Sequence, residues 1–190
     1  MKEIEVKILD MDPEKMVAKL KDVGAEKVEA GLVNVTYFDY PDDRLMKAGS
    51  FIRVRSFGHR VELVLKHHIS SGDHKIMEEI ETTVGDYDVA VRLFDSLGMK
   101  KFGDHEKYRA TYRLGNVRFE MDKHPSVPWL MEVEAPTEAE VEEGVKRLGL
   151  DMSQTTTKNS GEILREQGIT DYFFTFKEKG ESPDYDRLFE

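Results

Sequence analysis

The feature that most constrains the fold is an alternation of charged and apolar residues that returns in segment after segment. The N-terminal segment Glu3-Ile4-Glu5-Val6-Lys7 shows it in its simplest form. Successive side chains of a β-strand point to opposite faces of a sheet, so this segment would place its charges on one face and its apolar residues on the other. The same pattern predicts antiparallel strands near residues 33–39, 51–57, 61–67, 76–84, 105–114, 116–122 and 130–134.

Amphipathic helices are predicted between some of these strands. Asp12 before Pro13 is typical of an N-cap followed by a first-turn proline, and Thr137 with Glu140 forms a capping-box pattern. Each predicted helix is followed by a glycine that suits the left-handed position after a helix, at Gly24, Gly98 and Gly149. The apolar stripes of these helices need an apolar surface, so we expect them to cover the apolar face of the sheet. The charged face would then be concave, or the inside of a barrel, although an ordinary sheet with one solvent-exposed face gives the same alternation.

The charged face carries both signs of charge. Arginine and lysine side chains on it would suit a polyanion, because their donors match phosphate oxygens. These basic residues are Lys7, Arg53, Arg55, Lys66, Lys107 and Arg109. Carboxylates on the same face would suit Mg²⁺ or Mn²⁺, the hard cations that bridge proteins to phosphates. The acidic residues are Glu3, Glu5, Glu79, Glu81, Glu120, Asp122, Glu132 and Glu134. The pattern predicts a site for a metal–polyphosphate complex.

Composition excludes several other classes. The net charge of −10 argues against a nucleic-acid partner or an anionic membrane surface. The chain has no cysteine, which excludes disulfides, thiolate metal sites and cysteine nucleophiles. No apolar run approaches the length of a membrane span, so we expect a cytoplasmic protein. The length suits one domain, predicted over residues 1–168, with a C-terminal extension over residues 169–190.

The ordered set of charged motifs resembles the CYTH superfamily, the triphosphate tunnel metalloenzymes. The matching segments include Glu3-x-Glu5-x-Lys7, Tyr37-Phe38-Asp39, Phe51-Ile52-Arg53-Val54-Arg55, Leu63-Val64-Leu65-Lys66, Glu79-Ile80-Glu81, Glu106-Lys107-Tyr108-Arg109, Glu120-Met121-Asp122 and Met131-Glu132-Val133-Glu134. The resemblance implies an α+β fold: a closed antiparallel barrel of about eight strands around a charged tunnel, with the helices packed outside. The family often has an aspartate where this chain has Val35, and Ser-Tyr where it has Ser160-Gly161.

The resemblance also implies roles for individual residues. Divalent-metal ligands would be Glu3, Glu5, Glu120, Asp122, Glu132 and Glu134. Triphosphate contacts would be Lys7, Arg53, Arg55, Lys66, Lys107, Arg109 and Lys158. The catalytic residues would be Glu79 and Glu81, which would hold water or help to deprotonate the attacking group, together with Lys107. The implied cofactor is Mg²⁺ or Mn²⁺, and a homodimer is compatible with the family.

The activity implied first is that of a class IV adenylyl cyclase, which converts ATP to cyclic AMP and pyrophosphate. The short one-domain layout and Glu106-Lys107-Tyr108-Arg109 favour that branch. The alternative is a triphosphatase acting on inorganic, thiamine or nucleoside triphosphate, and a second alternative is a non-catalytic polyphosphate- or nucleotide-binding module. The histidines His67, His68 and His74 are expected in a polar loop, with a soft-metal site as the alternative.

Overall fold

The computed structural model describes the backbone of residues 4–71 and 75–190, and the side chains of these residues except 68–71 and 75–78. The predicted metal ligand Glu3 and the side chains of His68 and His74 lie outside the described residues. The contacts within the chain define two compact units. Unit 1 comprises residues 1–32, 107–170 and 176–190, and unit 2 comprises residues 33–106 and 171–175.

The described strands form one hydrogen-bonded sheet, in the order β5-β4-β3-β2-β6-β7-β8-β1-β9, with β10 beside β6. The strands are β1 (Ile4–Ile8), β2 (Glu26–Asp39), β3 (Phe51–Phe57), β4 (Arg60–Ser71), β5 (Lys75–Val84), β6 (Lys100–Leu114), β7 (Val117–Lys123), β8 (Leu130–Ala135), β9 (Thr155–Thr156) and β10 (Phe173–Phe174). The α+β class and the antiparallel pairing agree with the prediction. Within residues 4–71 and 75–190 the strand order ends at β5 and at β9, so hydrogen bonding does not confirm the expected closed barrel.

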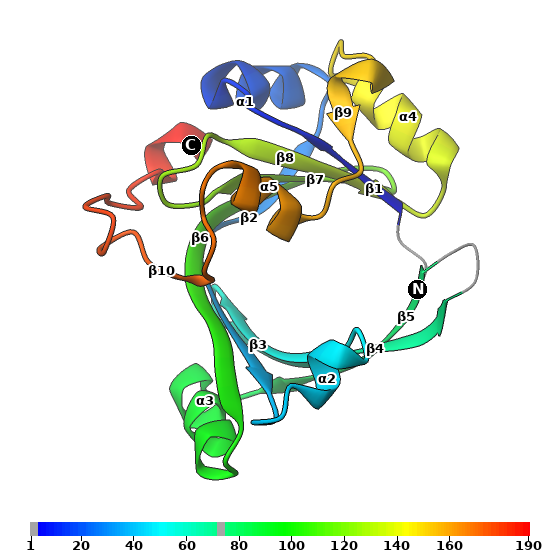
Figure 1. The fold of residues 1–190 in the computed structure, drawn as a ribbon. Coiled ribbons are helices and arrows are strands. Elements are labelled where there is room, and N and C mark those ends of the chain that lie inside the picture. Colours follow the sequence, from blue (N-terminus) through cyan, green and yellow to red (C-terminus); the bar gives the residue numbers. More distant parts are fainter. Residues whose placement is uncertain (1–3, 72–74) are drawn as a thin grey trace. The chain divides into compact units, whose positions relative to one another are not determined.

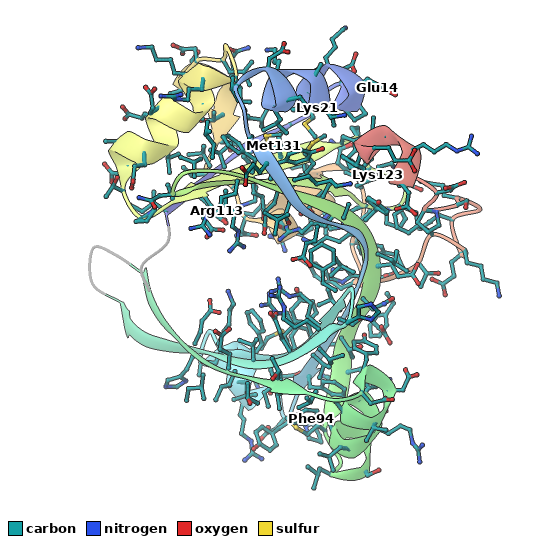
Figure 2. All side chains as sticks on the ribbon, turned by 180° about the vertical axis from the view of Figure 1, so that it is seen from behind. Glu14, Lys21, Phe94, Arg113, Lys123 and Met131 are labelled. Carbon is teal, nitrogen blue, oxygen red and sulfur yellow. The ribbon has the colours of Figure 1, made fainter. Side chains whose placement is uncertain are left out.

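In unit 1, helices cover the apolar face of the sheet as predicted. Helices α1 (Pro13–Asp22) and α4 (Glu138–Arg147) lie on one side of β1, β7 and β8 (Figure 1). Leu20 of α1 and Val141 of α4 are almost fully buried in one core with Met131 of β8. Figure 2 shows Met131 on this covered face of the sheet and Arg113 on the opposite face. The apolar positions of these strands therefore form the core, and their charged positions share the other face.

The predicted helix ends are also confirmed. The side chain of Asp12 accepts a hydrogen bond from the Lys15 amide, and that of Thr137 accepts one from the Glu140 amide. The glycines after α1, α3 and α4 adopt positive φ, at Gly24, Gly98 and Gly149. Helix α3 (Tyr87–Ser96) belongs to unit 2, where its Phe94 packs with Phe38 and Val54 of the sheet (Figure 2).

Four short helical elements of the described residues were not predicted: α2 (Arg44–Lys47), the 3₁₀ turn η1 (Met152–Gln154), α5 (Ser160–Glu166) and the 3₁₀ turn η2 (Asp186–Phe189). None of the helices found in the described residues is long and apolar enough to cross a membrane.

The C-terminal extension is ordered within the chain itself. Phe174 in β10 is paired with His105 of β6 in unit 2, and the two rings stack. Beyond it, Phe176 and Phe189 are buried in the core of unit 1, where Phe189 stacks on the Tyr108 ring. Phe189 belongs to the final 3₁₀ turn, η2 (Asp186–Phe189). The extension therefore contributes side chains to the packing of each unit.

Candidate functional site

The charged face of unit 1 brings together residues from four strands. Register places Lys7 of β1 opposite Glu132 of β8, and Glu132 opposite Glu120 of β7. In the next row, Asp122 of β7 is opposite Arg109 of β6. All five side chains are buried, which is unusual for charged groups unless they are paired.

Arg109 is the centre of this cluster. Its guanidinium donates to Glu120, to both oxygens of Asp122 at 2.6 and 2.5 Å, and to Glu132 at 2.8 Å. Burial opposes the charged form of Arg109, but the three carboxylates raise its pKa well above the usual value. Burial alone would raise the pKa of Glu132, but the neighbouring Arg109 and Lys107 lower it to about 2. The residues predicted as metal ligands and the predicted phosphate-binding arginine are therefore paired with one another.

Two lysines flank Arg109. Lys107 donates to Asp122 at 2.8 Å, and Lys7 donates to Glu5 at 2.5 Å and lies 3.5 Å from Glu132. Burial and the neighbouring Arg109 lower the pKa of Lys107. Burial also opposes the charge on Lys7, but Glu132 and Glu5 raise its pKa above the ordinary value. The lysines thus bring further positive charge to the acids around Arg109.

The edge of the cluster is more exposed. In register, Glu5 is opposite Glu134, and Glu134 is opposite Arg118. The Arg118 guanidinium donates to Glu120 at 2.7 Å and lies 3.7 Å from the Glu134 carboxylate. The side chains of Glu5 and Arg118 are 48% and 43% exposed. Among the acids of the cluster, Glu5 therefore has the carboxylate that solvent ions reach most readily.

The donor chemistry of this face fits a hard divalent cation, since its acids offer carboxylate oxygens. The hydroxyl of Thr111, buried directly opposite Glu120, has no hydrogen-bond partner among the described atoms and is a further oxygen donor. Within the part of the chain that the structure describes, no group of three or more acids or histidines is arranged to hold a metal ion. The cations of Lys7 and Arg109 lie against the carboxylates instead.

Some residues on this face were missed or lie elsewhere. His124 is buried near Lys107 and Asp122, and burial together with Lys107 lowers its pKa to about 4. It lies just past the end of β7, two residues after Asp122, so strand parity does not assign its side chain to a face and no sequence signal identified it. Lys158 is exposed and paired with Glu166 at 2.6 Å, whereas Ser160 of α5 donates to Glu132 at 3.4 Å.

Unit 2 carries the remaining predicted residues on one face of β3, β4 and β5. Arg55 donates to one oxygen of Glu62 through two nitrogens, and Lys66 pairs with Glu79 at 2.6 Å. Arg53 is opposite Val64, which is opposite Glu81. The Nε atom of Arg53 is buried with no hydrogen-bond partner among the described atoms, and burial and Arg55 lower its pKa.

Tyr37 completes this face of unit 2, because it lies directly opposite Arg53. Tyr37 packs edge-on against Phe51, and burial raises its pKa although Arg53 opposes the shift. The polar loop expected around His67 was wrong: His67 lies within β4, on the face opposite to that of Lys66, and shares a hydrogen bond of 3.1 Å with Ser50.

The CYTH domain profile matches residues 1–163, which is most of the chain. The chain belongs to the CYTH domain family. Among curated proteins, none matches the chain significantly.

Solved structures share this CYTH fold. The PH1012 protein of Pyrococcus horikoshii OT3 is 25% identical with a TM-score of 0.66, over 83% of this chain and 96% of that one. A protein of Vibrio parahaemolyticus named as a candidate adenylate cyclase is 15% identical with a TM-score of 0.72, over 86% and 97% of the two chains. The Hippeastrum protein HpAC1, named as a candidate adenylyl cyclase with a dominant triphosphatase activity, is 16% identical with a TM-score of 0.55, over 96% and 98%.

The structure shows what surrounds the two positions at which this chain departs from the CYTH pattern, Val35 and Ser160-Gly161. Val35 is buried on β2 directly opposite Arg55, and the carboxylate that pairs with Arg55 is Glu62 on β4. Ser160 begins α5 and contacts Glu132, and Gly161 follows it in the same helix. This CYTH chain thus pairs Arg55 with an acid from the strand on its other side.

Proposed function

We propose that this protein is a divalent-metal-dependent enzyme acting on a triphosphate. The first candidate activity is that of a class IV adenylyl cyclase. The observation that carries the proposal is the buried cluster in unit 1, in which Arg109, Lys107 and Lys7 contact Glu120, Asp122 and Glu132. A buried ion cluster is costly to desolvate and is often no more stabilising than apolar residues of the same volume. Keeping so many charges buried is therefore better explained by a charged ligand than by stability.

The basic side chains are the proposed triphosphate contacts. In unit 1 they are Lys7, Lys107 and Arg109, with the more exposed Lys158; in unit 2 they are Arg53, Arg55 and Lys66. Arginine presents a planar fork that matches two phosphate oxygens, and the lysines act as compact point charges. The resemblance to CYTH enzymes supports each assignment, and burial of Arg109 would make its interaction with a phosphate stronger than in water.

The proposed ligands for Mg²⁺ or Mn²⁺ are Glu3, Glu5, Glu120, Asp122, Glu132 and Glu134. Such a cation, when bound, neutralises charge on phosphates and activates the attacking oxygen. The carboxylates of this set would orient the substrate through that charge, and Lys107 would stabilise negative charge that develops on the phosphoryl oxygens. Glu79 and Glu81 of unit 2 are proposed to hold water or accept the proton of the attacking group.

The cyclase reaction is an intramolecular displacement. The ribose 3′-oxygen of ATP bonds to the α-phosphorus, the bond from that phosphorus to the bridging oxygen breaks, and pyrophosphate leaves. The hydroxyl proton passes to a carboxylate or water. A triphosphatase is the second candidate: water attacks the terminal phosphorus, the bond from that phosphorus to the bridging oxygen breaks, and the diphosphate leaves while the attacked phosphoryl group becomes orthophosphate. It uses the same charged residues, and HpAC1, which shares the fold, is described by that activity.

The test is incubation of the purified protein with ATP, inorganic triphosphate and thiamine triphosphate, each with Mg²⁺ or Mn²⁺, followed by separation of products. Cyclic AMP with pyrophosphate is the expected result. Orthophosphate would replace the cyclase by the triphosphatase. Binding without any product would leave the non-catalytic polyphosphate-binding module as the answer and refute both enzyme assignments.

A matched pair of variants connects the activity to the cluster. Glu5→Gln removes a carboxylate charge that is half exposed and outside the apolar core, so the fold should survive. We expect turnover to fall by at least about 100-fold, a typical cost of losing an electrostatic stabiliser. Glu14→Gln makes the same chemical change on α1, where Glu14 projects away from the sheet (Figure 2), and should leave turnover unchanged. Equal turnover in both variants would contradict the metal-ligand role of Glu5.

A further inference from the structure

Thr111 of β6 is a buried side chain on the charged face of unit 1 that lies outside the ion-pair network. It is two residues from both Arg109 and Arg113, so all three share one face of the strand, the face on which Figure 2 shows Arg113. Thr111 is only 5% exposed, and its hydroxyl has no hydrogen-bond partner among the described atoms. A buried hydroxyl without a partner destabilises a folded chain, and valine has a similar shape and strand propensity. Packing alone therefore does not explain a threonine at this position.

The residue directly opposite Thr111 is Glu120 of β7, whose carboxylate contacts two arginines. One oxygen accepts a hydrogen bond from Arg109, and the other accepts one from Arg118 at 2.7 Å. Residues that face each other across an antiparallel pair have Cβ atoms about 4.5–5.5 Å apart, which is within reach of a hydrogen bond between a threonine hydroxyl and a glutamate. Glu120 is therefore the acceptor that strand register offers to the hydroxyl of Thr111.

We propose that Thr111 is a positioning residue that donates a hydrogen bond to Glu120 when the Arg109 guanidinium turns to a triphosphate. This inference rests on the proposed function, in which Arg109 binds phosphate and Glu120 binds the metal ion. A guanidinium that moves to phosphate oxygens leaves one oxygen of Glu120 without its donor, in a buried place where a carboxylate needs one. The Thr111 hydroxyl replaces that donor and keeps the carboxylate oriented. Each carboxylate oxygen has two lone pairs, so the same oxygen can contact a cation and the hydroxyl together.

Thr111→Val separates this role from a structural one. A hydroxyl that gains its partner only when ligand binds strengthens binding without stabilising the free protein. The free energy of unfolding of the ligand-free variant in urea should therefore be unchanged or higher than that of the wild type. Its affinity for inorganic triphosphate with Mn²⁺ in calorimetry should fall at least about fivefold, the factor that corresponds to one hydrogen bond. Lower stability of Thr111→Val would show that the hydroxyl already has a partner in the free protein and would overturn the proposal.

Tyr112→Phe is the matched control. Tyr112 is the next residue of β6, and its buried hydroxyl also lacks a hydrogen-bond partner among the described atoms. It belongs to the apolar core on the covered face of the sheet, so removing its hydroxyl should lower neither stability nor affinity. Thr36→Val calibrates the unfolding assay, because the Thr36 hydroxyl shares a hydrogen bond of 2.6 Å with the Tyr87 hydroxyl and donates to Asp104 at 3.3 Å. That variant should be less stable than the wild type and bind triphosphate with unchanged affinity.

Thr111→Ser completes the test, because it keeps the hydroxyl and should bind triphosphate nearly as tightly as the wild type. Equal loss of affinity in Thr111→Ser and Thr111→Val would assign the effect to packing and refute the role of the hydroxyl. Equal affinities of the wild type, Thr111→Val and Tyr112→Phe would refute the role of Thr111 while the proposed function stands. A wild-type chain that binds no triphosphate with either Mg²⁺ or Mn²⁺ would refute the proposed function, and the role of Thr111 would fail with it.

Discussion

Replacing Arg109 by methionine should destabilise the protein at neutral pH in a way that disappears in acid. Methionine keeps much of the length of the side chain but removes the guanidinium that contacts Glu120, Asp122 and Glu132. The two lysines that remain are Lys107, which contacts Asp122, and Lys7, which lies 3.5 Å from Glu132. Among the described residues, Glu120 then keeps only the 43% exposed Arg118 as a cationic partner, so the buried acids lose the one buried cation that they share.

The magnitude follows from the structure in two ways. Removing one partner of a buried ion pair costs about 3–5 kcal/mol. Independently, lowering the pKa of Glu132 to about 2, from about 4.3 in an unfolded chain, corresponds to about 3 kcal/mol of stabilisation at pH 7. Arg109 is the largest single cause of that lowering, so the two values agree in order of magnitude, at about 3 kcal/mol.

The sign of the pH dependence is fixed by the direction of the shift. A carboxyl group whose pKa is lowered by folding contributes stability above its unfolded value and loses it as the pH falls through the folded value. The contribution of Glu132 is therefore complete above about pH 5 and is lost between about pH 4 and 2. The Arg109→Met variant lacks this contribution at every pH, so the difference from wild type should shrink as the solution is acidified.

Urea unfolding of both proteins at pH 7, 4 and 2.5 measures that difference. The control is Arg118→Met, since Arg118 also contacts Glu120 but is 43% exposed, and a pair this exposed contributes at most about 1 kcal/mol. A loss of about 3 kcal/mol at pH 7 that is the same at pH 2.5, or equal losses for Arg109→Met and Arg118→Met, would refute the electrostatic explanation of the cluster.

Three further predictions test other parts of the fold and site. Arg53→Met should weaken binding of inorganic triphosphate at least about tenfold in calorimetry without lowering stability, because a buried guanidinium with an unpartnered Nε costs stability until an anion binds. Arg55→Met should instead lower stability by about 1–3 kcal/mol in urea unfolding, since Glu62 then keeps, among the described residues, only the more exposed guanidinium of Arg60. Equal stability of the two variants would contradict this division. Gly144→Ala should destabilise the protein by about 1–3 kcal/mol, since the added Cβ would lie 2.8 Å from a methyl group of Val117. Gly85→Ala is the control and should be neutral, because there is open space around Gly85. Equal melting temperatures of the two variants would disprove the packing argument.

Much of the fold was predictable because strand parity is a local property. The alternation in β1, β3, β7 and β8 assigned each side chain to a face, and α1 and α4 cover the apolar face of unit 1 as their stripes required. Helix α3 packs on the sheet of unit 2 through Ala90, Val91 and Phe94, whereas Val89, Leu93 and Leu97, which would form its apolar stripe, are exposed. Closure of the sheet was not predictable in this way, since it depends on which strands meet at the ends of the order.

The site was predicted in composition but not in pairing. Parity placed Arg109 and Glu132 on one face, but register determines that Arg109 reaches three acids at once. Register depends on turns and bulges across the whole sheet, which no single segment contains. His124 was missed for a different reason: it lies just past the end of the predicted strand, where the alternation stops being informative.

The near balance of charge in the unit 1 cluster leads to a last prediction about how ligands bind. Three acids are compensated by three bases there, so a triphosphate alone adds negative charge to a buried site and a divalent cation alone adds positive charge. Burial of uncompensated charge is costly, and the two ligands together should therefore bind better than either alone.

This coupling is reciprocal, because a cation that strengthens triphosphate binding must be bound more tightly in the presence of triphosphate by the same factor. Calorimetry with inorganic triphosphate, with and without Mn²⁺, should show a gain of at least about tenfold, beyond that explained by complex formation in solution. Tight Mn²⁺ binding to the protein without triphosphate would contradict the balance, since it would require Arg109 and Lys7 to leave the carboxylates with no anion to receive them.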